Sequence, residues 1–274
     1  GKPFSDFVIP EQRDIVTERL QAVLSGHEPV RPCELVCVRR DGSYVDVVAE
    51  DAVNIGFDGA PDGVRTTMAD ITDQKRTHAQ LMETIRRVEE TIEGTIEAMS
   101  WIIETKDPYT AGHERRVAEL ACAIGRELGL SEERLRALRT AAIIHDIGKI
   151  YIPAEILSKP CRLSDIEFSM VKTHANFGYQ TVERIRFPQR VGYAILQHHE
   201  RMDGSGYPAG LKKDQIILEA RILAVADVVE SMASHRPYRP ALGIDAALKE
   251  ITSKKGILYD PDVVDACVNL FTSG

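Results

Sequence analysis

Residues 74–105 constrain the fold more than any other part of the sequence, because they can form little except one long helix. The run contains one glycine and no proline, and its apolar residues recur at intervals of three, four and seven. Such spacing is typical of a helix with one apolar stripe, close to a coiled-coil repeat. Thr95 lies in the gap of this stripe, which comprises Leu81, Ile85, Val88, Ile92, Met99 and Ile102. A helix of this length divides the chain into a segment before it and a segment after it.

The segment before the long helix has the pattern of a small α+β unit. Asp41-Gly42 lies between two β-rich runs and predicts a hairpin with a type I′ turn, which needs a positive φ at both central residues. Gly26 stands where a preceding helix is expected to stop. The predicted elements are a helix over 11–24, strands over 33–39 and 44–55, a turn over 56–63, and a third strand that ends near residue 70.

The segment after about residue 98 has the pattern of a helical domain. Ser131 is expected to cap the start of one helix. Ser164 and Glu167 have the spacing of a capping box, and Asp260 precedes a proline at an expected first helical position. The chain is therefore predicted to be mainly α, with an all-α domain after the long helix.

The composition is that of an ordinary soluble globular protein. The chain has 274 residues, with 34 basic and 42 acidic side chains and a formal net charge of −8. This charge argues against nucleic-acid coat proteins and polybasic membrane binders, but not against a small anionic ligand. No apolar run approaches the roughly 18–20 residues of a membrane span. Five cysteines without a CxxC motif argue against a disulfide framework, so a reducing cytoplasm is expected. Gly1, in place of Met, is expected to mark a fragment boundary.

Histidines and aspartates in apolar helical contexts are the strongest functional signal. Taken alone, each is explained as well by a core histidine, a helix cap or a carboxylate bonded to the backbone. Together they are costly to bury unless something compensates them, and a metal centre does so by taking neutral imidazoles and carboxylates as ligands. The set comprises His113, His145, Asp146, His174, His198, His199 and Asp227.

Three motifs follow one another along residues 98–274. They are His145-Asp146-Ile147-Gly148-Lys149, then His198-His199-Glu200-Arg201 with Asp203-Gly204-Ser205-Gly206-Tyr207-Pro208, then Ala226-Asp227 with Arg236-Pro237-Tyr238-Arg239. With these motifs the segment strongly resembles the HD-GYP subgroup of the HD metal-dependent phosphohydrolases. The resemblance implies an all-α domain that hydrolyses the bacterial second messenger cyclic di-GMP to linear pGpG, with a slower second cleavage to GMP.

The same resemblance implies a role for each position. The implied ligands of one metal ion are His113, His145, Asp146 and Asp227. The implied ligands of a second ion are His174, His198 and His199. Asp146 would bridge the ions and, with Lys149, would be catalytic. Lys149 follows His145 by four residues, so the two are expected on one helix face, with the lysine aimed at a substrate phosphate. A nitrogen and carboxylate set suits iron or manganese, with zinc as an alternative.

Two further sets are implied to contact the substrate. Gly206, Tyr207 and Pro208 would form a loop beside the site that handles substrate and recognises a signalling partner, although the same residues also suit a simple tight turn. Arg236 and Arg239 would contact the phosphates or guanines of the ligand. Solvated surface charges are the alternative explanation for these two arginines.

Residues 1–73 resemble the C-terminal part of a PAS sensor domain. The matching pieces are Pro10-Glu11-Gln12-Arg13, Arg40-Asp41-Gly42-Ser43 and Asp70-Ile71-Thr72; a generic three-stranded α+β cap is the alternative. The expected domains are thus a PAS-like segment over 1–73, a linker helix over 74–97 and the catalytic domain over 98–274. The linker is expected either to pair in a homodimeric coiled coil or to pack on its own domain.

Alternatives to the leading function remain open at this point. The same chemistry on another cyclic dinucleotide, such as cyclic GMP-AMP, is one. A non-enzymatic interaction module is another, disfavoured because all seven ligand positions and Lys149 are filled. Members of the family that hold three metals carry a Glu four residues before the first ligand histidine. Here that position is Tyr109, a poor ligand at neutral pH, so two metals are predicted.

Overall fold

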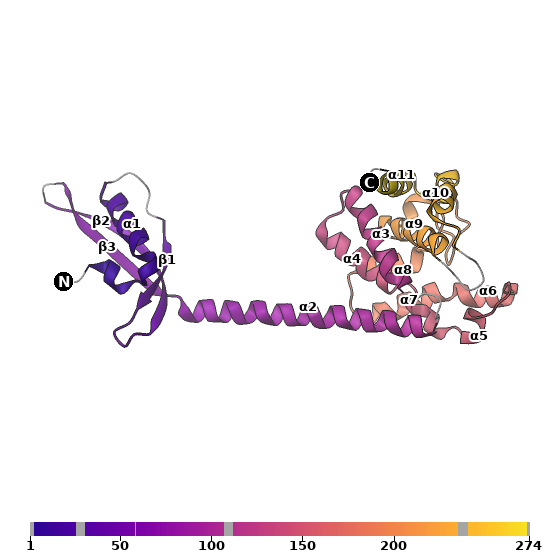
Figure 1. Ribbon diagram of the computed structural model, residues 1–274, viewed down its shortest axis with the longest axis horizontal. Helices are drawn as coiled ribbons and strands as arrows, with labels where there is room; N and C mark the ends of the chain where they lie inside the picture. Colours follow the sequence, from indigo (N-terminus) through magenta and orange to yellow (C-terminus); the bar gives the residue numbers. More distant parts are fainter. Residues whose placement is uncertain (1–2, 26–30, 58, 107–111, 235–240, 273–274) are drawn as a thin grey trace. The chain divides into compact units, whose positions relative to one another are not determined.

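The structure, a computed structural model, describes residues 3–25, 31–57, 59–106, 112–234 and 241–272 (Figure 1). The chain forms two compact units, Gly1–Glu90 and Thr91–Gly274. Among the described helices, none combines the length and the apolar character needed to cross a membrane.

The first unit is a three-stranded antiparallel sheet with one helix against it. After two short 3-10 turns, η1 (Phe4–Phe7) and η2 (Pro10–Gln12), come α1 (Arg13–Ser25), β1 (Cys33–Val38), β2 (Tyr44–Ile55) and β3 (Pro61–Asp70). The strand order is β1-β2-β3. Alternate residues of the strands face α1, as in a sheet with one buried face; Leu35 pairs with Val47 and both pack near Val16. The predicted α+β unit is present, and its resemblance to a PAS domain stays a prediction.

The predicted hairpin joins β1 to β2, but its turn is not of type I′. The connection between the strands is five residues long, 39–43, and Arg39 N donates to Ser43 O at 2.7 Å within it. Of Asp41 and Gly42, only Gly42 has a positive φ, +85°. The Asp41 carboxylate accepts from Ser43 N at 2.9 Å. This hydrogen bond from the backbone to a side chain stabilises the turn, so that the five-residue connection needs only one residue in the left-handed conformation.

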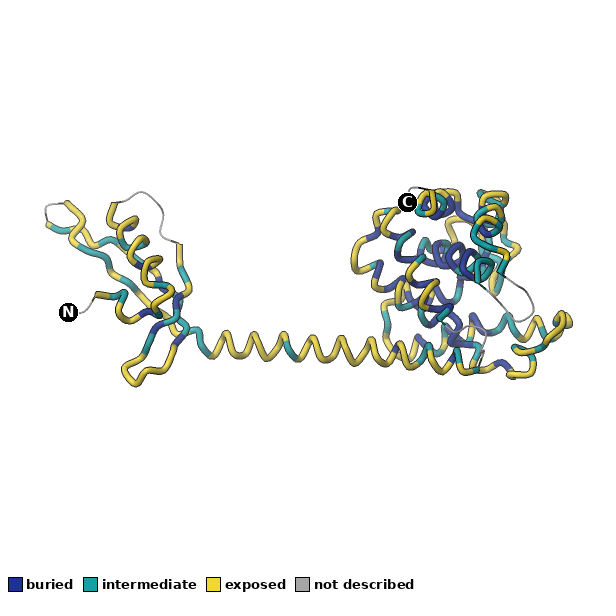
Figure 2. Tube along the Cα trace, in the orientation of Figure 1, coloured by how far each residue is buried: buried dark blue, intermediate teal, exposed yellow. Residues whose placement is uncertain are grey.

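The long helix α2 spans Thr72–Lys106 without interruption. Leu81, Ile85, Val88 and Ile92 of the predicted stripe are 43–54% exposed, and Figure 2 shows α2 mostly exposed until its C-terminal turns. There Ile96 and Ile103 are buried at 7% and 2%. The C-terminal third of α2 therefore packs on its own domain, and its two buried residues lie outside the predicted stripe. Pairing of the linker with a second copy stays a prediction.

The second unit is built from helices. Ser131 and the Ser164–Glu167 capping box start α4 and α6 as predicted. The elements are α3 (His113–Glu127), α4 (Glu132–Ile143), η3 (Ile147–Tyr151), α5 (Ala154–Leu157), α6 (Asp165–Lys172), α7 (His174–Glu183), α8 (Gln189–Gln197), η4 (Lys213–Gln215), α9 (Leu218–Ala233), α10 (Ile244–Ser253) and α11 (Pro261–Thr272).

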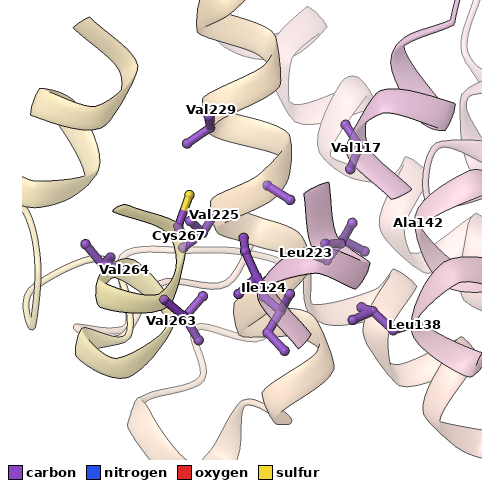
Figure 3. Packing of buried hydrophobic residues seen from close by; sticks show 14 of the residues in the cluster. Val117, Ile124, Leu138, Ala142, Leu223, Val225, Val229, Val263, Val264 and Cys267 are labelled. Atoms are coloured by element: carbon purple, nitrogen blue, oxygen red, sulfur yellow. The ribbon is translucent and has the colours of Figure 1, made fainter. Parts of the chain in front are cut away.

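Helix α9 is the centre of this unit and contacts α3, α8, α10 and α11. Its buried residues include Leu223, Val225 and Val229, which pack with α3, α4 and α11 (Figure 3). A second apolar cluster joins the end of α2 to α4 and α8, and contains Ile144 and Ile147. These two residues flank His145 and Asp146, so close packing restrains the segment that carries them.

Candidate metal centre

The structure brings all seven candidate ligands together in the second unit, and six of them lie at helix ends. His113 is the first residue of α3, and Asp227 lies within α9. His145 and Asp146 follow α4, His174 starts α7 directly after α6, and His198 and His199 follow α8. Loops between helices converge at this point, which explains why residues so distant in sequence meet.

The ligand atoms form two groups joined by a third. One group is His113, His145 and Asp227, another is His174, His198 and His199, and a third is His145, Asp146 and His198. Within each group the ligand atoms lie within 4.8 Å of one another. His174 Nε2 lies 3.6 Å from Asp146 Oδ1, and His145 Nε2 lies 3.6 Å from Asp146 Oδ2. Asp146 thus lies between the two groups, one oxygen toward each.

Backbone carbonyls orient three of the histidines. His145 Nδ1 lies 2.8 Å from Ala142 O, His174 Nδ1 2.7 Å from Val171 O, and His198 Nδ1 2.6 Å from Ile195 O. In each case the carbonyl is three residues upstream, in the last turn of the preceding helix, where carbonyls lack an intrahelical partner. A proton on Nδ1 satisfies that carbonyl and leaves the Nε2 lone pair to face the centre.

Two carboxylates of α9 orient His113 instead. Its Nε2 lies 3.2 Å from Asp227 Oδ1, and its Nδ1 contacts Glu230 Oε2. Burial opposes the charged form of His113, but the hydrogen bonds that it donates to Asp227 and Glu230 outweigh this effect and raise its pKa to about 10. In the metal-free protein His113 therefore carries a proton at neutral pH.

The three histidines of the other group, 174, 198 and 199, stay neutral. Burial lowers the pKa of His174, takes that of His198 well below its usual value, and brings that of His199 to about 3. Burial would raise the pKa of Asp146, but Lys149 and the surrounding histidines hold it well below its usual range. Neutral imidazoles and an ionised carboxylate are the forms in which these side chains bind metals.

Lys149 lies at the centre, but not by the helical spacing that the sequence predicted. The segment after His145 is a turn followed by the 3-10 helix η3, so the i, i+4 face does not exist. Lys149 instead contacts Asp146, three residues earlier, with Nζ 2.7 Å from Oδ2. Gly148 permits this arrangement: a Cβ there would lie 1.9 Å from His174 O. Only glycine allows η3 to approach α7 so closely.

The Gly-Tyr-Pro loop folds back onto the centre. The Tyr207 ring lies over that of His199, with centroids 4.7 Å apart, and Tyr207 N donates to His199 O at 3.3 Å. Glu200, 2% exposed, accepts from Ala209 N at 2.7 Å and from Leu211 N at 2.9 Å. A Cβ at Gly206 would lie 2.4 Å from Arg201 N. The loop is thus held on both sides of Tyr207.

A pocket of about 550 Å³ opens over the centre. Its volume is typical of small-molecule sites. Two cationic side chains, Lys149 and Arg201, and two carboxylates, Asp146 and Asp227, line it together. The full lining is His113, Asp146, Lys149, Val171, His174, His199, Arg201, Tyr207, Asp227, Val228, Ser231 and Met232. Of the residues predicted to contact the substrate, Lys149 and Tyr207 belong to this lining, whereas Gly206 and Pro208 do not. Arg236, Arg239 and Tyr109 lie outside the described residues.

Three residues to which the sequence analysis assigns no role also belong to the centre. Arg201 lines the pocket, and Glu230 contacts His113. Glu114 follows His113 on α3, is fully buried, and has no hydrogen-bond partner for either carboxylate oxygen among the described residues. The helical spacing of Asp227 and Glu230, three residues apart on α9, is a signal that could have identified Glu230.

The donor set fits a divalent metal centre. Imidazole nitrogens and carboxylate oxygens converge without thiolates, and these ligands suit iron, manganese or zinc. The excess of buried polar groups would be costly without a cation to compensate them. Each group offers three protein ligands, which leaves positions open for water or substrate.

Known proteins share this domain. A description of the HD domain matches residues 97–263. The chain is 42% identical over 189 residues to the cyclic di-GMP phosphodiesterase response regulator RpfG of Xanthomonas campestris pv. campestris, a match that covers 68% of this chain and 50% of that protein. It is 37% identical over 171 residues to 3′3′-cGAMP-specific phosphodiesterase 3 of Vibrio cholerae, covering 62% of this chain and 37% of that protein.

A solved structure shares the fold. Bd1817, an HDG"Y"P protein from Bdellovibrio bacteriovorus, superposes with a TM-score of 0.50 at 18% identity, covering 78% of this chain and 84% of that one. The chain spans at most half the length of the two curated relatives. With the HD-domain match extending over more than half of its residues, the chain belongs to the HD domain family.

Proposed function

We propose that this chain is a metal-dependent phosphodiesterase that hydrolyses cyclic di-GMP to linear pGpG. The observation that carries the proposal is the pair of ligand groups that share Asp146 beneath a pocket lined by Lys149 and Tyr207. The relatives that carry the same domain are named as cyclic dinucleotide phosphodiesterases.

The proposed centre holds two divalent ions, iron or manganese. Asp227 and the histidines 113 and 145 would hold one, the histidines 174, 198 and 199 would hold the other, and Asp146 would contact both. When bound, the ions would supply a water of lowered pKa and a Lewis-acid clamp on the phosphodiester.

The protein's own residues would supply orientation and charge. The neutral histidines present Nε2 lone pairs, and Lys149, held by Asp146 at 2.7 Å, would contact a phosphate oxygen at the mouth of the pocket. Arg201 and Tyr207 line the same opening. A planar guanidinium and an aromatic ring suit a phosphate and a purine, respectively.

Cyclic GMP-AMP is the second candidate substrate, because the Vibrio cholerae relative is named for that ligand. Side-by-side turnover of the two cyclic dinucleotides by protein loaded anaerobically with Fe²⁺ or with Mn²⁺, with products identified by chromatography, decides between them. We expect cyclic di-GMP to be hydrolysed to pGpG faster than cyclic GMP-AMP is hydrolysed. Metal-loaded protein that converts neither nucleotide would leave a non-enzymatic signalling module as the function.

We also propose that α2 pairs with a second copy of the chain. The exposed side chains of Leu81, Ile85, Val88 and Ile92 repeat at coiled-coil spacing. Light scattering should show a dimer for the wild type and a monomer when Ile85→Asp and Ile92→Asp are combined. A wild-type monomer would remove this pairing without affecting the catalytic proposal.

The remaining assignments complete the proposal. Residues 1–73 would be the end of a PAS-like sensor, 74–97 the linker and 98–274 the catalytic domain. Pro208 and Ala209 of the Gly-Tyr-Pro loop are exposed and would offer a surface to a signalling partner. All five cysteines are free in the structure, which suits the reducing cytoplasm.

A further inference from the structure

His113 is oriented differently from the other histidines of the centre. His145, His174 and His198 each have a carbonyl from the last turn of a preceding helix against Nδ1. His113 is the first residue of α3, so no carbonyl of its own helix lies upstream of it. Its Nδ1 meets the side chain of Glu230 instead, 117 positions along the chain.

Glu230 is itself held in place by both of its oxygens. It is 7% exposed on α9, and Oε2 contacts His113 Nδ1. Oε1 accepts from Arg116 Nε at 2.6 Å and from Ser234 Oγ at 2.6 Å. Arg116 is one turn after His113 on α3, and Ser234 follows the last residue of α9. The carboxylate therefore joins α3 to α9 at the point where the ligand histidine begins.

The direction of these contacts separates Glu230 from the ligands themselves. Asp227, one turn earlier on α9, faces His113 Nε2 at 3.2 Å, the nitrogen that points into the centre. Glu230 faces the opposite nitrogen, and its two oxygens are occupied by protein donors. A carboxylate behind a ligand histidine fixes the ring and its tautomer and strengthens it as a donor.

We propose that Glu230 is a positioning residue that accepts the Nδ1 proton of His113 and so directs its Nε2 to the ion shared with Asp227. The assignment of this ion rests on the proposed function, whereas the contact to Glu230 does not. Because no described contact links Glu230 to His174, His198 or His199, its removal should weaken one ion and spare the other.

Titration of metal-free protein with Mn²⁺, followed by the signal of the free ion, tests this directly. The wild type should show two ions per chain. Glu230→Ala should weaken one of them about 10- to 100-fold, the size expected when a carboxylate behind a ligand is lost, and leave the other within about twofold. Glu230→Gln keeps an oxygen that accepts from Nδ1, so the affinity for this ion should fall less than in Glu230→Ala. Ser234→Ala should reduce it less still.

The matched control is Glu219→Gln. Glu219 is also buried on α9 and pairs with Arg134 at 2.9 Å and with Arg190 at 3.1 Å, but it has no described contact with the centre. Chemical unfolding of each metal-free variant measures the structural cost separately. Glu219→Gln should lose stability with both ions retained. If the Glu230 variants lose stability and weaken both ions equally, or weaken neither, Glu230 is only structural and the proposal is wrong.

Failure of the proposed function would look different. Wild-type protein would bind its ions yet hydrolyse neither cyclic dinucleotide, while the selective effect of Glu230→Ala on one ion would persist. The titration reads metal affinity rather than turnover, so the two conclusions stand or fall separately.

Discussion

The two groups of candidate ligands are oriented by different kinds of contact. His174 and His198 take their orientation from carbonyls three residues upstream, so a few residues of local sequence are enough to build them. The group around His113 depends on Asp227 and Glu230, more than a hundred positions away. One group is all imidazole. The other is the carboxylate-rich group, in which Asp227 and Glu230 orient His113 only when α3 packs against α9, although its His145 is oriented by the local carbonyl of Ala142.

This difference has an electrostatic consequence. The all-imidazole group is neutral without metal, because burial keeps protons off its rings. The carboxylate-rich group already holds a cation, the protonated His113. A metal ion that enters the first group meets open lone pairs, and one that enters the second must displace a proton.

Replacing Asp146 should affect both groups equally, because Asp146 lies between them. Asp146→Ala removes the carboxylate that faces His145 and His174 at 3.6 Å and leaves Lys149 without this partner. We expect both ions to be lost and hydrolysis to fall below detection, with helical content retained by circular dichroism. Asp245→Ala, at an exposed position on α10, is the control and should behave as wild type. Normal metal content in Asp146→Ala would refute the shared-ligand assignment.

Gly148→Ala should damage the imidazole group first. The added Cβ would lie 1.9 Å from His174 O, so η3 and α7 must separate. Overpacking of this kind costs about 1–3 kcal/mol, and the ion held by His174 should weaken most. Gly94→Ala is the matched control, since a Cβ there meets nothing within 4 Å and should stabilise α2 by about 0.5–1 kcal/mol. Denaturant unfolding measures both; equal stability of the two variants would contradict the close approach.

Local patterns in the sequence were enough to predict much of the secondary structure and the candidate ligands. The strands, the hairpin, the helix caps and the seven converging residues all lie in short motifs, where neighbouring residues determine the structure. The spacing from His145 to Lys149 misled, because an i, i+4 argument assumes an α-helix and the chain there forms a 3-10 turn. Glu230 and Glu114 were missed for another reason. Their roles arise from packing between helices: the spacing of Glu230 from Asp227 places both on one face of α9 but does not show that His113 packs against that face.

Metal uptake by the two groups should depend on pH differently. The pKa of His113 is about 10 in the metal-free protein, so below that pH an ion must displace its proton, and its affinity should rise about tenfold per pH unit. The pKa of His199 is about 3, so the other group should show no such slope between pH 6 and 8. Mn²⁺ titrations at pH 6, 7 and 8 should give one sloping and one flat affinity. Two flat affinities would show that His113 is not held protonated.

The effect of Glu114 should be confined to stability. Burial, reinforced by the charge of Asp146, raises its pKa to about 8 from a usual value near 4.5. Between these values the folded, metal-free protein keeps a proton that the unfolded chain releases, so stability should fall as pH rises through this window. The slope is at most about 1.4 kcal/mol per pH unit. Glu114→Gln removes the titrating group, so its stability advantage over wild type should grow from pH 6 to pH 8.

The control for this prediction is Glu119→Gln, at an exposed position on the same helix. It should follow the wild-type dependence on pH in denaturant unfolding of the metal-free protein. If the stability of Glu114→Gln shows the same dependence on pH as the wild type, the Glu114 carboxylate does not take up a proton on folding. It would then have a compensating partner in the folded protein, such as an internal water. The advantage of Glu114→Gln could instead appear in the metal-free protein and disappear when metal is bound. The metal ion in the neighbouring group would then supply the positive charge that compensates the Glu114 carboxylate. The contrast between the two groups would then extend beyond the ligands to the first turn of α3.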